Sequence, residues 1–177
     1  MVYTQHYTSP FGGITMASDG TALIGLWFDG QKYFADSLKG EHQEKSLAVF
    51  DDTARWLDIY FRGSEPDFMP KININGTPFR KSVAEIMLTI PYGKTMTYGE
   101  IAHKIAEQRG NTKMSARAVG GAVGHNSISI IIPCHRVVGT NGSLTGYAGG
   151  IDKKIQLLKL ERADISKPFA ANKGTAL

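Results

Sequence analysis

The sequence predicts a two-domain chain of the α/β plus α class, in which a small α/β unit precedes a mostly helical unit. Two observations lead to this prediction. Apolar runs joined by a turn signal begin the chain, whereas beyond residue 77 apolar side chains recur at helical spacing. A length of 177 residues suits one sizeable domain or two small ones, and 42% hydrophobic with 20% charged residues is an ordinary globular composition.

The first domain, expected over residues 1–75, begins with strands. Residues 13–17 and 22–28 are apolar runs joined by a Ser-Asp-Gly-Thr turn, and an Asp-Gly turn between such runs indicates an antiparallel hairpin. An amphipathic helix over about 46–62 should follow, because Phe50, Ala54, Leu57 and Phe61 recur at helical spacing. Residues 63–78 carry three prolines and two glycines and are predicted to be a linker.

The second domain, expected over residues 76–165, is predicted from capping signals. Thr77 and Pro78 form an N-cap and first-turn pair for one helix. Thr97 and Glu100 fit a capping box for the next helix. Ser115 caps a third, and two short helices joined by a turn suggest a helix-turn-helix.

The remaining elements of this domain follow in order. The third helix should span about 116–123, with Gly124 near its end. Residues 128–132 form a β-branched run, expected as a buried strand or extended segment, and 139–150 form a glycine-rich loop. A last helix is expected over about 152–162, and the tail 166–177 is expected to be disordered.

Charge is distributed unevenly between the two domains. Residues 1–77 hold six Lys and Arg against ten Asp and Glu, a net of −4, whereas the remaining residues hold 14 against six, a net of +8. An acidic half beside a basic half is what a nucleic-acid-binding domain with a supporting domain would show. The alternative is a basic surface that is merely solvated.

Composition excludes several classes of protein. No apolar run is long enough to span a bilayer, and the N-terminus lacks the basic and apolar stretches of a secretory signal. One cysteine excludes an internal disulfide and a cysteine-based zinc cluster, and fits a reducing, intracellular setting. No metal site is expected either, because four histidines lack partners at metal-ligand spacing: His6, His42, His103 and His125.

The chemistry is centred on the run 130–138, in which a thiol follows an apolar segment. Cys134 stands beside His135 and Arg136, and cationic neighbours lower the pKa of a thiol and increase its thiolate fraction. Adjacent residues on a straight strand point to opposite faces, so a bridging water is expected between Cys134 and His135. The alternative is that Cys134 is a small buried filler.

The predicted helix after Ser115 is unusually rich in small residues. Its interior glycines cost helix stability, which makes sense where a helix must lie close against something such as a DNA groove. Arg117 is the one long side chain near its start. The alternative is tight packing inside the protein, with Arg117 merely solvated.

Taken together, these motifs resemble those of the O6-alkylguanine-DNA alkyltransferases, also called methylated-DNA–protein-cysteine methyltransferases. The similarity is in register over about 78–162 and only in general layout over 1–77. It implies an N-terminal ribonuclease H-like domain and a C-terminal winged-helix-like DNA-binding domain. The matching positions are residues 117–122, Asn126, residues 133–138, Gly142, residues 147–150, Leu160 and Glu161.

The resemblance implies roles for five catalytic residues. Cys134 is the alkyl acceptor, His135 its general base through a water, and Glu161 the carboxylate that orients His135. Asn126 bridges the helix-turn-helix to the active-site loop, and Tyr147 holds the flipped base and helps neutralise the guanine leaving group. A simpler alternative for Glu161 is a salt bridge within its helix, to Lys159 or Arg162.

The resemblance also implies a partner, double-stranded DNA containing O6-alkylguanine, bound by a monomer without cofactor, metal or membrane, in the cytoplasm or in the nucleoid or nucleus. The third helix enters the minor groove, Arg117 fills the gap left in the duplex, and Tyr98 crowds the target phosphate unless it is simply a surface aromatic. The DNA-contacting set is Tyr98, Gly99, Ser115, Ala116, Arg117, Gly120, Arg136 and Thr140. The base-pocket set is Pro133, Val137, Ala148 and Gly149.

Two departures from the family concern the pocket. Ser127 and Ser129 replace prolines that many members carry, and Ala148 lacks the hydroxyl that some relatives have. Two rival functions stay open. A non-catalytic DNA-lesion binder would not use Cys134, whereas a Cys-His hydrolase or acyltransferase would use the thiol and turn over repeatedly.

Overall fold

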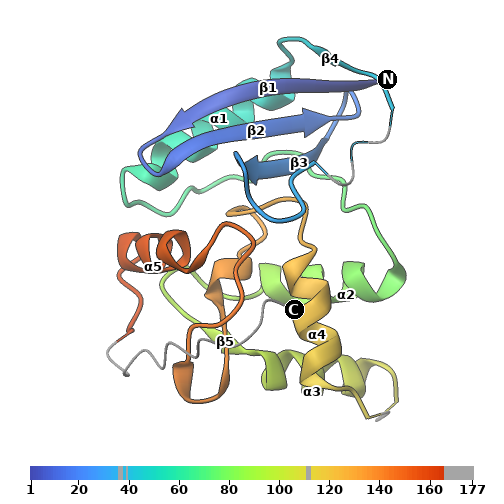
Figure 1. Cartoon of the computed structure of the whole chain (residues 1–177), viewed down its shortest axis with the longest axis vertical. Helices are drawn as coiled ribbons and strands as arrows, with labels where there is room; N and C mark the ends of the chain where they lie inside the picture. The colour runs from blue at the N-terminus through green and yellow to red at the C-terminus, as the bar shows by residue number, and fades with distance from the viewer. Residues whose placement is uncertain (36–37, 39, 111–112, 166–177) are drawn as a thin grey trace. The chain divides into compact units, whose positions relative to one another are not determined.

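The structure, a computed structural model, describes residues 1–35, 38, 40–110 and 113–165 and forms two compact units (Figure 1). The first unit comprises Met1–Asn75 together with Ser127–Ser129, and the second comprises Gly76–Asn126 and Ile130–Leu177. The expectation for the tail 166–177 lies outside the described residues.

A four-stranded sheet in the order β3-β2-β1-β4 forms the first unit (Figure 1). The strands are β1 (Val2–Ser9), β2 (Gly12–Ser18), β3 (Leu23–Phe28) and β4 (His42–Glu44). The predicted hairpin is the antiparallel β2–β3 pair, and Asp19 closes its turn by accepting hydrogen bonds from the backbone of Thr21 and Ala22. Strands β1 and β4 were not predicted, because their side chains are mostly half-buried or exposed and show no apolar alternation.

The predicted amphipathic helix is α1 (Ala48–Phe61), which lies against one face of this sheet (Figure 1). Its buried face includes Phe50, Trp56, Leu57 and Tyr60. The outer edge of β3 is partly paired by the predicted linker, because the amide of Leu23 donates to the Lys71 carbonyl and the Asn73 amide donates to the Leu23 carbonyl.

The same edge of β3 carries Ser127–Ser129. The Leu26 amide donates to the Ser127 carbonyl at 2.8 Å, and the Ser129 amide returns a bond to the Leu26 carbonyl at 2.9 Å. The run expected over 128–132 as a buried strand or extended segment is buried as predicted, and it forms a single bridge at Ile128 instead of a strand. Ile130 ends the extended conformation, because its φ of 68° turns the chain away.

Helices dominate the second unit: α2 (Pro78–Leu88), α3 (Tyr98–Gln108), α4 (Ala116–Gly124) and α5 (Ile151–Leu160). The short strands β5 (Met96–Thr97) and β6 (Val137–Val138) pair in parallel. Apolar side chains of α2, α3 and α4 pack together, as expected of a helix-turn-helix with a supporting helix. The fully or nearly fully buried ones are Val83, Ile86, Met87, Ile101, Ile105, Val119 and Val123.

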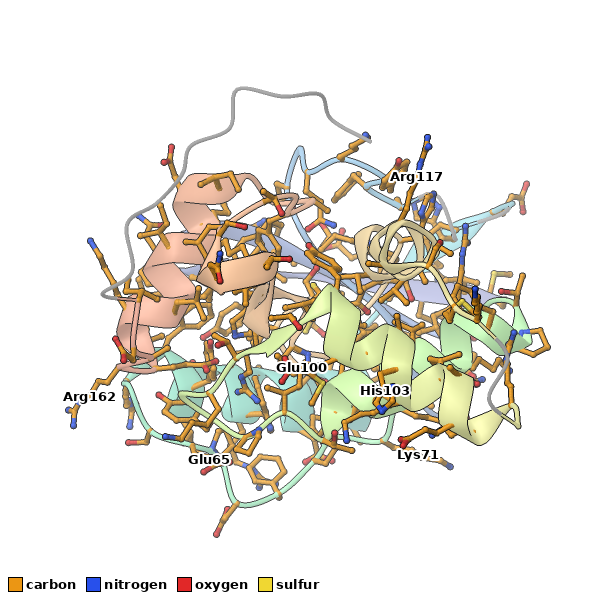
Figure 2. All side chains as sticks on the ribbon, turned by 90° about the horizontal axis from the view of Figure 1, so that it is seen from below. Glu65, Lys71, Glu100, His103, Arg117 and Arg162 are labelled. Atoms are coloured by element: carbon orange, nitrogen blue, oxygen red, sulfur yellow. The ribbon has the colours of Figure 1, made fainter. Side chains whose placement is uncertain are left out.

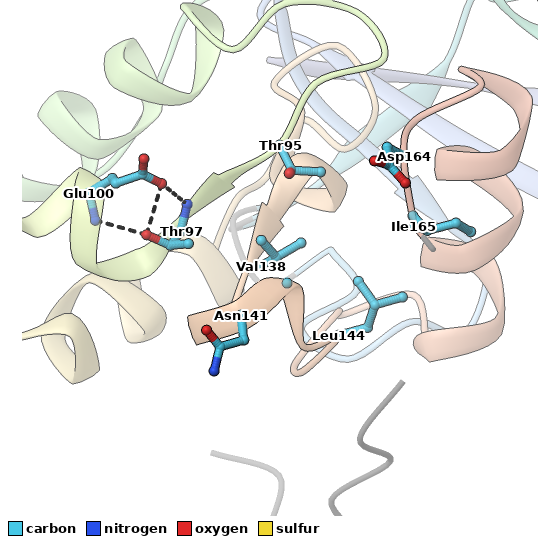
Figure 3. A pocket seen from close by; sticks show the side chains of 9 residues that line it. Thr95, Thr97, Glu100, Val138, Asn141, Leu144, Asp164 and Ile165 are labelled. Atoms are coloured by element: carbon cyan, nitrogen blue, oxygen red, sulfur yellow. Dashed lines mark hydrogen bonds between the residues drawn. The ribbon is translucent and has the colours of Figure 1, made fainter. Parts of the chain in front are cut away.

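The predicted caps are confirmed. The side chains of Thr77 and Ser115 each accept a hydrogen bond from a backbone amide of the first helical turn. Thr97 and Glu100 form the full capping box, drawn as dashed lines in Figure 3. The last helix begins at Ile151, one residue earlier than expected. The described helices are all too short or too polar to cross a bilayer.

Candidate active site

Cys134 lies at the start of a 3-10 turn, Cys134–Arg136 (η1), and is only 4% exposed. The amide nitrogen Nδ2 of Asn126 donates both to the Cys134 sulfur, at 3.2 Å, and to the Ile132 carbonyl, at 2.9 Å. Asn126 directly follows α4 and its cap residue, so it links the helix-turn-helix to the thiol. A filler cysteine would need no such donor.

The expected lowering of the thiol pKa is wrong. Burial raises the pKa of Cys134, and the Asn126 hydrogen bond and the charge of Lys154 only partly oppose it. The nearness of Arg136 in the sequence does not lower the thiol pKa, because its guanidinium bonds to Glu161 instead of the thiol. At neutral pH the resting sulfur is therefore a thiol, and a nearby base must remove its proton before it can react.

His135 and Glu161 meet in the interior, and both side chains are fully buried. His135 Nε2 lies 2.6 Å from Glu161 Oε1. Burial raises the pKa of Glu161, but the hydrogen bonds and charges of His135 and Arg136 outweigh it and bring the pKa to about 2. A charged carboxylate only accepts, so Nε2 carries the hydrogen and the imidazole lone pair is on Nδ1. Glu161 is thus no surface salt-bridge partner of Lys159 or Arg162.

Arg136 was expected to contact DNA, but its side chain is turned toward the interior of the second unit. Its side chain is buried, with Nε 2.8 Å from Glu161 Oε2 and Nη2 3.0 Å from Oε1, which is a bidentate ion pair. Its Nη1 donates to the Ile90 carbonyl at 2.6 Å. With these donors committed inside the unit, Arg136 does not lie on a surface that DNA could reach.

Two residues of the candidate site, Lys154 and Gly93, were not expected from the sequence. Lys154 is fully buried on α5, and its Nζ donates to the carbonyls of Val137, at 2.5 Å, and Thr145, at 3.1 Å. Burial lowers the Lys154 pKa to about 8, against the opposing effect of the Cys134 charge. A signal existed, because Lys154 stands on the same helical face as Leu157 and Leu158.

The second missed position is Gly93, in the turn after α2. Its amide donates to Glu161 Oε2 at 3.0 Å. Its φ is +72°, and a Cβ would stand 2.8 Å from the Glu161 carbonyl oxygen, so only glycine fits here without displacement. The turn at residues 91–93 therefore supplies a backbone donor to the site as well as following the end of α2.

Two tyrosines lie close enough to Cys134 that a negative charge on its sulfur would raise their pKa. The Tyr147 hydroxyl is buried with no hydrogen-bond partner among the described residues, and burial raises its pKa well above the usual value. The Tyr98 hydroxyl donates to the Thr145 carbonyl at 3.1 Å, and burial raises its pKa to about 12. Tyr98 is therefore not a simple surface aromatic.

The four residues expected to line the base pocket are buried or half-buried. Pro133 and Val137 are buried on either side of η1. Ala148 and Gly149 are half-buried in the loop after Tyr147. The four residues thus stay candidates for the walls of a pocket around the thiol.

The start of α4 is exposed, as a DNA-binding element requires. Ser115, Ala116 and Arg117 are exposed, and Figure 2 shows the Arg117 side chain extending outward from the helix. A Cβ at Gly120 would make only ordinary contact with the Tyr98 ring, at 3.9 Å, and one at Gly121 would meet open space. Packing inside the protein therefore does not explain these small residues. Gly99 and Thr140 are exposed too.

A separate hollow of about 380 Å³ lies elsewhere in the second unit (Figure 3). The capping box of Thr97 and Glu100 uses two of its polar side chains. Its lining residues are Thr95, Thr97, Glu100, Val138, Asn141, Gly142, Leu144, Asp164 and Ile165. Cys134 is not among these residues, and among the described residues no three acidic, histidine or cysteine side chains gather to hold a metal.

Fold and site together define a class: a two-domain protein in which a helix-turn-helix unit holds a buried thiol beside a histidine–carboxylate pair. Residues 78–163 match the family model described as 6-O-methylguanine DNA methyltransferase, DNA binding domain, and residues 2–74 match its ribonuclease-like domain. The chain belongs to the 6-O-methylguanine DNA methyltransferase family. The resemblance seen in the sequence and the expected fold class are confirmed.

Close relatives share nearly the whole chain. A methylated-DNA–protein-cysteine methyltransferase of Methanosarcina acetivorans is 44% identical over 90% of this chain and 98% of its own. One of Mycobacterium bovis is 40% identical over 92% and 94%. The crystal structure of Mycobacterium tuberculosis O6-methylguanine methyltransferase is 40% identical, covers 96% of each chain and has a TM-score of 0.76. The structure of Mycobacterium tuberculosis OGT in complex with DNA is 39% identical over 95% and 96%, with a TM-score of 0.78.

Proposed function

We propose that this protein repairs DNA by direct reversal, moving the alkyl group of O6-alkylguanine, mainly methyl, onto Cys134 once per molecule. Family membership supports the reaction type, since the relatives are named for cysteine acceptors in protein. The observation that carries the assignment to Cys134 is the arrangement around its sulfur. Asn126 donates to the sulfur, and the adjacent His135 is fixed by Glu161.

The reaction balances with these groups and water. His135 Nδ1 takes the thiol proton through a water, and the sulfur attacks the alkyl carbon. An S–C bond forms, the C–O6 bond breaks, and its electron pair goes to guanine, which gains a proton at N1; the proton that the thiol gave to His135 balances the one that guanine gains. A thioether has no easy leaving group, so each molecule reacts once.

Charge and hydrogen bonds around the sulfur would stabilise the transition state. The Lys154 charge opposes the negative charge that develops on sulfur. The Tyr147 hydroxyl, buried and without a partner among the described residues, is placed to donate to the flipped base as negative charge moves onto it. Asn126 keeps the loop in position through the Ile132 carbonyl.

The substrate must be flipped out of the duplex, because a stacked base cannot bring its O6-alkyl group to a buried thiol. We assign the DNA contact to the exposed start of α4, inserted in the minor groove with Arg117 filling the gap. Gly99, Tyr98 and Thr140 would lie along the backbone of the target strand. The protein would act as a monomer inside the cell, in the cytoplasm or nucleoid or nucleus, where its DNA substrate is.

The test is intact-protein and peptide mass spectrometry after incubation with excess duplex carrying one O6-methylguanine. We expect one added methyl group on the peptide containing Cys134, no further gain, and guanine restored in the duplex. Cys134→Ser and the unmethylated duplex are the controls. Tight binding without added mass would make the protein a lesion binder, and repeated product formation would make it a hydrolase or acyltransferase.

A further inference from the structure

We propose that Arg136 is a positioning residue for alkyl transfer. It offsets the charge of Glu161 and fixes both carboxylate oxygens, so that His135 stays uncharged and can take the thiol proton at neutral pH. The inference rests on the proposed function, but its central claim concerns the charge of His135 and is measurable without DNA.

The geometry around Glu161 leaves none of its oxygens without a donor. Oε1 receives His135 Nε2 at 2.6 Å and Arg136 Nη2 at 3.0 Å. Oε2 receives Arg136 Nε at 2.8 Å and the Gly93 amide at 3.0 Å. Arg136 supplies two of these four contacts in a planar fork, which sets the carboxylate plane in which His135 must bond.

The guanidinium is itself held in place. Its third nitrogen, Nη1, donates to the Ile90 carbonyl at 2.6 Å, just after α2 ends. The Tyr92 ring lies under it, with its centroid 5.7 Å from the guanidinium carbon. These contacts use donors that a DNA-binding arginine would offer to phosphate, and they make Arg136 part of the interior.

Charge explains why this matters for His135. A lone buried carboxylate beside an imidazole favours the imidazolium, which has no lone pair to take a proton. Burial lowers the pKa of His135 and Glu161 raises it, while the charges of Arg136 and Lys154 lower it again. The charged groups that act on His135 are Glu161, Arg136 and Lys154, and the ionisable Cys134 and Tyr147 lie close to the same cluster. Arg136 contacts the carboxylate directly, whereas Lys154 donates to the Val137 and Thr145 carbonyls.

The test compares Arg136→Met with the unaltered protein across about pH 6 to 9, in single-turnover methyl transfer and in NMR titration of His135. We expect the His135 pKa and the acid limb of the rate profile to move up together by about one pH unit or more. The rate should then fall most at the acid end of this range, in step with the fraction of uncharged His135, and recover to within about threefold near pH 9.

Two further variants separate charge from structure. Arg136→Lys keeps the charge but not the two-point fork, so the acid limb of its profile should stay near that of the unaltered protein even if its maximal rate is lower. Arg136→Met combined with Glu161→Gln removes both charges and should return the His135 titration to its original range, and these two variants decide the matter if Arg136→Met does not fold. An equal loss of rate at every pH, with an unmoved His135 titration, would overturn the proposal. If the unaltered protein accepts no methyl group, the proposed function fails while the titration still tests Arg136.

Discussion

The two units bury different kinds of polar side chain. In the described part of the first unit the buried polar residues are all uncharged, and in that of the second unit they are all ionisable. The first set is Ser9, Ser18, Gln31, Thr53 and Ser129, and the second is His135, Arg136, Lys154 and Glu161. Ser18 and Thr53 bond carbonyls four residues away, whereas Glu161 bonds residues 25 and 26 positions away.

The uncharged buried residues stabilise local structure, whereas the buried ionisable residues surround the candidate active site. A buried hydroxyl on a nearby carbonyl costs little and holds a turn or helix. A buried charge is costly, and apolar residues of similar volume often stabilise as well. With His135 neutral, Arg136 and Lys154 against Glu161 give the cluster one net positive charge beside the sulfur. That is the sign that a developing thiolate requires, so chemistry explains why the second unit retains these charges.

The largest effect is expected at acid pH, where protonation of Glu161 should destabilise the fold. Its pKa falls from 4.5 to about 2 on folding, so its contribution is complete above about pH 5 and lost as pH falls through about 2. We expect the free energy of unfolding to drop by about 3 kcal/mol more in the unaltered protein than in Glu161→Gln over this range. Urea unfolding at several pH values measures it, and parallel curves would contradict the prediction.

A smaller effect is expected for Lys154→Met, which removes a positive charge that lowers the pKa of the thiol. Methyl transfer near neutral pH should slow about tenfold to a hundredfold. The difference in rate between the variant and the unaltered protein should narrow above about pH 8, because Lys154 loses its own charge there. Lys159→Met, on the exposed side of the same helix, is the matched control and should leave the rate unchanged. A rate difference that is the same at every pH would show that Lys154 acts only through its hydrogen bonds.

The smallest effect should come from the first unit. Thr53 is fully buried in α1 and donates to the Val49 carbonyl, which also serves the helix. Thr53→Val should therefore change stability by about 1 kcal/mol or less and leave the methyl-transfer rate unchanged. Thermal unfolding measures the change in stability, and a single-turnover assay measures the methyl-transfer rate. A slowed rate would show that buried polar residues of the first unit also contribute to the reaction.

Local signals made much of the fold predictable. Helix starts at Thr77, Thr97 and Ser115 depend on contacts within one helical turn, so the sequence alone reveals them. The turn at Asp19 is equally local. For the site, the resemblance placed Cys134, His135 and Glu161 in one group, and the structure brings the last two into direct contact.

Long-range contacts account for what the sequence could not reveal. The direction of the Arg136 side chain depends on Glu161, 25 residues away, so its neighbours in sequence suggested the wrong partner. The donor role of Gly93 depends on a residue 68 positions away. The thiol pKa depends on burial, which exists only after the chain has folded.

The three residues Ser127–Ser129 bear on how such proteins recombine. Because they pair with Leu26 at the edge of β3, the first unit is not encoded by one continuous stretch of the gene. An exchange of residues 1–75 with a relative would set this edge against a peptide from the other parent, and a mismatch between the two would leave part of the strand edge unpaired, which promotes aggregation. Chimaeras of this family should therefore inherit the short peptide and the sheet from the same parent.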